Sequence, residues 1–188
     1  MIIFDKKDAC EGGVYLIINL VKWEAYIGET EDLLRRAGNY KHDLKRNRGE
    51  ANDELQVAFN NGDGLLWFVL LYGNASKKVV GNYRDIESFY IALFKEKGFK
   101  IYNDKQKNVT HVSLYNETYN KEDIRFLTEN AYKELDNDFR ERFGYTLDEM
   151  KDMSVDARNG VWNTYSNNIK TLLGPAQKNE RYIILEKE

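Results

Sequence analysis

The sequence predicts a mixed α/β (α+β) protein, in which helices flank a small central antiparallel sheet and a mainly helical region follows. Two β-rich runs, at 14–19 and 23–28, are separated by a few residues, as in a β-hairpin. Eight successive apolar residues, LLWFVLLY at 65–72, indicate a strand that is covered on both faces. Between these strands, apolar residues recur at the three- and four-residue spacing of amphipathic helices.

The predicted helices of the first unit follow from this periodicity. The first runs from Thr30, expected as its N-cap, to about Arg48, and its buried stripe consists of Leu33, Ala37, Tyr40 and Leu44. A short helix is expected at 53–60, and a longer one from Tyr83 to about Lys97, where Gly98 ends it. A short extended segment at 99–102 then closes a unit that covers residues 12–104.

Residues 105–188 are predicted to form a mainly helical accessory region of unknown role that packs on the first unit. Helices are expected at 121–143, 147–152 and 161–173, followed by a strand-like RYIIL. The segment 115–156 is acidic overall, and three roles remain open. In the first, aromatic side chains such as Trp162 and Tyr165 pack on the first unit. In the second, the cations Lys170, Lys178 and Arg181 join a DNA-reading surface. In the third, the acidic helix binds a protein partner or mimics DNA.

Composition indicates a globular chain and limits its partners. Hydrophobic residues make up 42% of it and the formal net charge is −3, so no general attraction to a polyanion is expected. One local basic patch stands out, opposed only by Asp43: Arg35, Arg36, Lys41, Lys45, Arg46 and Arg48. The single cysteine, Cys10, allows no internal disulfide, and His42 and His111 show no zinc-binding spacing. With no secretory or membrane-spanning stretch in the sequence, we expect a cytoplasmic protein.

A set of short motifs in residues 12–104 carries the functional interpretation. The chain has Gly13-Val14-Tyr15, then Ala25-Tyr26-Ile27-Gly28, then Arg36, Tyr40, Glu87 and Asn103. This order and spacing resemble the GIY-YIG nuclease family, with Val14 in place of the middle isoleucine. The helix arginine of that family, its following His or Tyr, its metal-binding glutamate and its late asparagine correspond to Arg36, Tyr40, Glu87 and Asn103.

The resemblance implies a divalent-metal-dependent DNA endonuclease of the restriction, mobile-element or phage type. Glu87 would hold Mg²⁺ (or Mn²⁺), and Arg36 would bind the scissile phosphate. Tyr15 would be the general base, directly or through metal-bound water, if nearby cations lower its pKa from about 10. Tyr26 and Tyr40 would orient water and phosphate, and Asn103 would hold the site together. Gly28 would let the backbone approach the ligand, and Lys22 is expected as an extra phosphate contact.

Helical geometry alone supports parts of this assignment. Arg36 borders the buried stripe of its helix with Tyr40 one turn away, and Glu87 falls inside the apolar stripe of the later helix. A carboxylate there requires a partner, either a cation or simply the dipole of its helix. Lys41, Lys45 and Arg48 lie on one flank of the first helix, and Arg35, His42 and Arg46 on the other. These cations are expected to contact DNA, although a solvated charged face has the same pattern.

Other functions are compatible with the sequence. A non-catalytic nucleic-acid-binding or protein-interaction module could keep the same fold, and a nuclease regulator could act through the acidic region. The expected partner of an enzyme is double-stranded DNA. Because one active site cuts one strand, cleavage of both strands would require a homodimer or two successive nicks.

Overall fold

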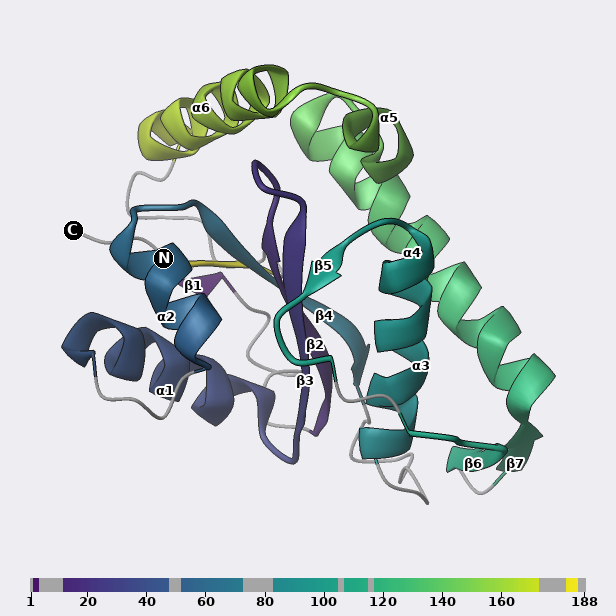
Figure 1. Cartoon of the computed structure of the whole chain (residues 1–188). Helices are drawn as coiled ribbons and strands as arrows, with labels where there is room; N and C mark the ends of the chain where they lie inside the picture. The colour runs from purple at the N-terminus through teal and green to yellow at the C-terminus, as the bar shows by residue number, and fades with distance from the viewer. Residues whose placement is uncertain are drawn as a thin grey trace.

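The computed structural model of the chain describes residues 2–3, 12–47, 52–72, 83–104, 107–114, 117–172 and 182–185. Over these residues the protein is mixed α/β, as predicted. A central sheet lies between a pair of helices on one face and two helices on the other, with further helices across its end (Figure 1). Of the described helices, none is long and apolar enough to cross a membrane.

The sheet is built on the predicted hairpin. Strands β2 (Gly13–Asn19) and β3 (Glu24–Thr30) pair antiparallel, with Tyr15 opposite Gly28, and β4 (Leu65–Tyr72) pairs antiparallel with the other edge of β2. Strand β8 (Tyr182–Leu185) lies on β4, and β1 (Ile2–Ile3) lies on β8. On the far side, β5 (Lys100–Ile101) is parallel to β3. The strand order is therefore β1-β8-β4-β2-β3-β5.

The expectation of a purely antiparallel sheet is wrong at β5. The chain reaches this strand after a crossover helix, and such a connection brings it back in the same direction as β3. The register of β2 on β4 also shifts between Val14 and Tyr15, so the pairing is irregular beside Tyr15. Such bulges reorient side chains and are frequent next to active sites.

One face of the sheet is covered by α1 (Leu33–Arg46) and α2 (Asp53–Asn60). The predicted stripe of α1 is buried as expected. Its N-cap, however, is Asp32, whose side chain accepts a hydrogen bond from the Arg35 N–H at 2.8 Å. Thr30 is the last residue of β3, and its hydroxyl accepts from the Asp32 N–H at 3.2 Å. The predicted N-cap at Thr30 is therefore wrong by two residues.

The other face is covered by α3 (Tyr83–Glu96) and α4 (Lys121–Phe143). Apolar residues of β2 and β3 on this face share one core with side chains of both helices, among them Ile91, Phe94 and Phe139. Helix α4 starts at the capping box of Asn120 and ends at Gly144, which adopts a φ of 77°. The predicted bounds of α4 are confirmed, and α3 ends one residue before the predicted Lys97.

The C-terminal region contributes to this same core. A small hairpin of β6 (His111–Leu114) and β7 (Glu117–Asn120), which was not predicted, precedes α4, and α5 (Leu147–Lys151) and α6 (Val155–Leu172) follow it. Helix α6 begins six residues before the predicted start. Its Trp162 lies so close to Gly64 that no Cβ would fit there, and Arg158 donates to the Val21 carbonyl of the β2–β3 turn at 3.0 Å. Cys10, Arg48, Lys178, Arg181 and the side chain of Lys170 lie outside the described residues.

Candidate functional site

Four aromatic side chains from four different elements form a buried cluster between the sheet and α1. The Tyr15 ring from β2 stacks on Trp67 of β4, with centroids 4.1 Å apart, and is stacked more distantly with Tyr26 of β3 at 6.2 Å. Tyr40 of α1 meets all three rings edge-on at 5.8 to 6.0 Å. The structure thus brings together the three predicted tyrosines. Trp67 was missed, although alternation along β4 already places it on the same face as Leu65 and Val69.

Gly28 makes room for this cluster. It lies opposite Tyr15 in the β2–β3 ladder, and a Cβ at this position would overlap the hydroxyl and ring of Tyr15 and approach the Tyr26 ring to 2.8 Å. Glycine is therefore required at position 28, because only it leaves room for the Tyr15 side chain to lie over β3. This role differs from the predicted one, in which Gly28 lets a ligand approach the backbone.

Arg36 is fixed at the border of the cluster by phenol groups. Its Nε donates to the Tyr15 hydroxyl at 3.3 Å, and its Nη2 donates to the Tyr40 hydroxyl at 3.4 Å. The guanidinium also lies over the Tyr40 ring, 4.7 Å from the centroid. No described carboxylate forms an ion pair with this half-buried cation. Its N–H groups beyond those two bonds remain available to an anion.

The tyrosines of the cluster are neutral at physiological pH. Burial is the main cause that raises the pKa of Tyr15, and the neighbouring Tyr26 raises it further, while Arg36 opposes both. Burial likewise raises the pKa of Tyr26 and of Tyr40 above the ordinary value. The protein's own cations therefore do not produce the lowered pKa that a base at Tyr15 needs. The Tyr15 side chain is also fully buried, and its hydroxyl donates a hydrogen bond to the Tyr40 hydroxyl oxygen at 3.3 Å.

Glu87 and Asn103 form the second part of the site. The Asn103 amide donates to the Glu87 Oε1 at 3.3 Å and to the Ile27 carbonyl, and its Oδ1 accepts from the Ile27 N–H at 3.1 Å. Because β5 ends at Ile101, this side chain continues the ladder on the edge of β3 where the main chain has left it. Asn103 thereby positions the carboxylate of α3 beside β3.

The two parts meet at Tyr26. The charge of Glu87 contributes to raising the pKa of Tyr26, which places the carboxylate within electrostatic range of that phenol. Tyr26, Arg36, Glu87 and Asn103 are only partly buried, whereas Tyr15 and Tyr40 are buried. Solvent therefore reaches the side of the cluster that carries the arginine and the glutamate.

The donor set at this edge is suited to a hard cation that keeps most of its water. In the part of the chain that the structure describes, no group of three His, Cys, Asp or Glu residues could hold a metal ion. Glu87 offers a single carboxylate, one of whose oxygens accepts from Asn103. Magnesium binds in this way, through one or two carboxylates together with water and phosphate oxygens.

The predicted DNA contacts divide into two groups. Arg35, Lys41, Lys45 and Arg46 belong to the same helix as Arg36, and all but the half-buried Lys41 are exposed. Lys22 lies elsewhere, at the hairpin turn, where its ammonium pairs with Asp63 at 2.5 Å. The turn is four strand residues beyond Tyr15, or about 13 Å. The structure therefore does not bring Lys22 to the tyrosine cluster.

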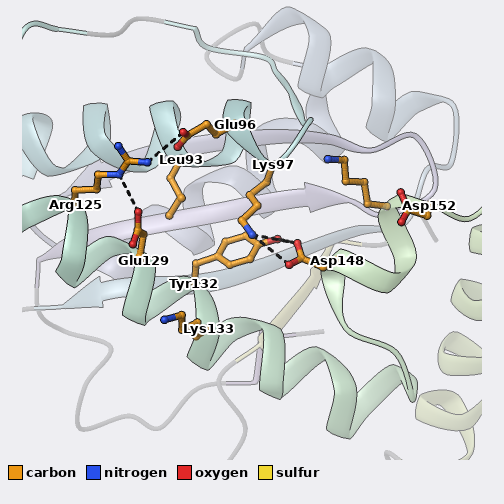
Figure 2. Close-up of a pocket in the computed structure, with 10 residues that line it drawn as sticks. Leu93, Glu96, Lys97, Arg125, Glu129, Tyr132, Lys133, Asp148 and Asp152 are labelled. Carbon is orange, nitrogen blue, oxygen red and sulfur yellow. Dashed lines mark hydrogen bonds and ion pairs between the residues drawn. The ribbon is translucent and has the colours of Figure 1, made fainter.

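A cleft lies away from this cluster, among α3, α4 and α5 (Figure 2). It has a volume of about 570 Å³. Several of its charged side chains pair with one another: Arg125 with Glu96 at 3.2 Å and with Glu129 at 2.8 Å, and Lys97 with Asp148 at 3.2 Å. Lys97 also lies over the Tyr132 ring, 4.6 Å from its centroid. None of the predicted site residues lines this cleft.

Comparison with protein-family models found no family that matches the chain. Comparisons with curated proteins and with solved structures found no match either. The functional interpretation therefore depends on the residues and their geometry.

Proposed function

We propose that the chain is a divalent-metal-dependent endonuclease that hydrolyses phosphodiester bonds in DNA, with its active site at the edge formed by β3, α1 and α3. One observation carries this proposal. Six residues that the motifs single out, from Tyr15 to Asn103, are connected through hydrogen bonds and charge around Tyr26 and Arg36, although they come from five separate segments of the chain. A packing role for each residue separately would not require an arginine and a glutamate at the same edge.

In this reaction, a water oxygen bonds to phosphorus as the bond from phosphorus to the 3′ oxygen breaks, and negative charge gathers on the phosphoryl oxygens. Arg36 would bind that phosphoryl group through its N–H groups not taken by Tyr15 and Tyr40. Tyr26 is partly exposed and close to Glu87, so it would orient the attacking water. Tyr15 and Tyr40 would hold the guanidinium in place, and Asn103 would hold Glu87.

The general base expected at Tyr15 remains a prediction. In the protein alone, this phenol is buried and protonated. A divalent cation bound at Glu87 would supply a Lewis acid that lowers the pKa of water and neutralises charge on the phosphate and the leaving oxygen. The chain's own contribution would be to hold Glu87 and Arg36, whose charges both act on Tyr26.

The burial of Tyr15 favours a second candidate, a non-catalytic module that binds nucleic acid through Arg36 and its neighbours. Such a module needs neither the Glu87 carboxylate nor a base. The two candidates therefore differ in what the loss of the Glu87 charge does to cleavage.

The test is cleavage of supercoiled plasmid in Mg²⁺ by the wild type, by Glu87→Gln and by Glu96→Gln. Glu96 belongs to the same helix but pairs with Arg125 at the distant cleft, so it serves as a matched control. We expect cleavage by the wild type, a loss of about 10²- to 10³-fold for Glu87→Gln, as for removal of one catalytic electrostatic group, and full activity for Glu96→Gln. A chelator should abolish cleavage, and Mn²⁺ should restore it.

A folded wild type that cuts no plasmid, linear or branched DNA would contradict the nuclease proposal. If such a protein still bound DNA, the non-catalytic candidate would replace it. Cleavage by Glu87→Gln at the wild-type rate would instead remove Glu87 from the site.

A further inference from the structure

Helix α1 carries basic residues on more than one side, and the structure distinguishes these sides. The contacts of Arg36 with Tyr15 and Tyr40 fix which side of α1 faces the candidate site. The buried stripe of α1 lies next to Arg36, and Lys41 borders the opposite edge of that stripe. Both border residues are half-buried, as this placement requires.

Asp43, hydrogen-bonded to His42 at 3.1 Å, lies about 20° from Arg36 around the helix axis, and the outward surface beyond it carries Asn39, Arg46 and Arg35. At 3.6 residues per turn, these lie about 60°, 80° and 100° from Arg36 around the helix axis. All three are exposed. In contrast, Lys41 lies about 140° from Arg36 across the buried stripe, and Lys45 lies about 180° away, on the opposite side of the helix. A polyanion bound at Arg36 reaches Arg46 and Arg35 without crossing the helix, but it does not reach the two lysines.

The described carboxylates neutralise the charge of this surface only in part, through the ion pair of Arg35 with Asp32 and through the nearby Asp43. Many cations elsewhere in the described structure have a carboxylate partner within 2.5 to 3.5 Å, including Lys22, Arg84, Lys95, Lys97, Lys100, Arg125 and Arg140. On the Arg36 side of α1, the Nε of Arg35 is 3.8 Å from Asp32, whose other oxygen caps the helix. Among the described residues, Arg46 forms no ion pair with a carboxylate. A protein with a net charge of −3 thus leaves a positive surface beside the candidate site.

The length of this surface suits a phosphate backbone. Arg35 and Arg46 are eleven residues apart, which is about 16 Å along the helix. One DNA strand carries a phosphate about every 3.4 Å along the duplex axis, so this span covers several phosphates.

We propose that duplex DNA bound at the candidate site continues along the outward, Arg36-facing surface of α1, where Arg46 and Arg35 contact backbone phosphates and Asn39 lies between them. Lys41, Lys45 and Lys22, which the sequence also offered as DNA contacts, lie outside this path. The inference deepens the proposed nuclease function and rests on it.

The test measures binding of a fluorescein-labelled DNA duplex by fluorescence anisotropy at several salt concentrations. All proteins carry Glu87→Gln so that the probe stays intact. Three double variants remove the same charge: Arg35→Gln with Arg46→Gln, Lys41→Gln with Lys45→Gln, and Lys133→Gln with Lys151→Gln at the distant cleft. Circular dichroism checks that each variant folds.

We expect the arginine pair alone to weaken binding, by about tenfold, and to reduce the salt-dependence slope by about two, one for each lost phosphate contact. The other two pairs should match the parent. If the arginine pair binds like the parent, or the Lys41 and Lys45 pair loses as much affinity, the path is overturned while the nuclease proposal stands. If the folded parent binds no duplex DNA, both the path and the nuclease proposal fail.

Discussion

The tyrosine cluster and the cleft among α3, α4 and α5 both combine aromatic rings with charged side chains, yet they differ in how the charge is balanced. In the cleft, Arg125 has two carboxylate partners, and Lys97 lies between Asp148 and the Tyr132 ring. In the cluster, the described partners of Arg36 are phenols, and one oxygen of Glu87 accepts from the Asn103 amide. The charges of Arg125 and Lys97 in the cleft are therefore balanced by neighbouring carboxylates, whereas Arg36 and Glu87 in the cluster do not form an ion pair with each other.

This difference distinguishes the proposed site from the cleft among α3, α4 and α5. Exposed ion pairs such as those of Arg125 contribute little to stability and need no ligand to complete them. A half-buried arginine without a carboxylate costs free energy unless something compensates it. We accordingly place function at the cluster and treat the cleft as a charged seam between helices.

The two regions lie against two separate cores on opposite faces of one sheet, and separating them tests how far each depends on the other. Residues of α4, including Ile124, Leu135 and Phe139, are buried in the core that contains β2 and β3. Each buried apolar side chain contributes about 1.5–3 kcal/mol, against a total stability of about 5–15 kcal/mol. We therefore expect a fragment of residues 12–104 to lack a cooperative thermal transition, measured by circular dichroism. A sharp transition close to that of the full chain would show instead that the cluster forms a separate domain.

A substitution that disturbs the cluster but leaves the cleft intact is Gly28→Ala. The added methyl group would overlap Tyr15, so we expect a loss of about 1–3 kcal/mol, or about 2–4 °C in melting temperature for each kcal/mol. Gly38→Ala is the control, because its Cβ would meet no atom within 4 Å in the exposed middle of α1. That change should stabilise the helix by about 0.5–1 kcal/mol. Equal melting temperatures for the two variants would contradict the packing of Tyr15 against Gly28.

Alkaline pH should weaken the cluster. Burial raises the pKa of Tyr15, Tyr26 and Tyr40, so the folded protein keeps these phenols protonated where the unfolded chain ionises them. Their contribution to stability is complete below the unfolded pKa of about 10 and falls as the pH rises above it, by up to about 1.4 kcal/mol per pH unit for one buried phenol.

Chemical denaturation from neutral pH to above about pH 10 measures this loss. In Tyr40→Phe the decline above pH 10 should be shallower than in the wild type. An equal decline in both proteins would show that Tyr40 keeps no raised pKa in the folded state.

Periodicity predicted the local elements well, because a helix or strand with one buried face records its period in the sequence. The bounds 53–60 and 121–143 and the hairpin of β2 and β3 agree with the structure. The β6–β7 hairpin was missed because HVSL and ETYN mix polar and apolar residues without a buried run. The predicted start of α6 was too late because the first turns of this helix, VDARNG, contain a glycine and have no apolar stripe.

The site was predicted as a list of residues, but their contacts were not. The helical wheel placed Arg36 beside Tyr40, as observed, but it did not predict the hydrogen bond of Arg36 to Tyr15. The stacking of Trp67 on Tyr15, the bridge of Asn103 to Ile27 and the parallel pairing of β5 depend on which strands become neighbours. Local sequence patterns do not contain that information. The pairing of Lys22 with Asp63, far along the chain, is of the same kind.

The most direct measurement of the central claim compares cleavage of supercoiled plasmid in Mg²⁺ by Arg36→Gln and Arg125→Gln. Both changes remove one arginine charge, one from the cluster and one from the cleft. The account predicts a loss of about 10²- to 10³-fold for Arg36→Gln and wild-type cleavage by Arg125→Gln, with both proteins folded. Equal activity of the two variants, or a greater loss at Arg125, would contradict the assignment of function to the tyrosine cluster.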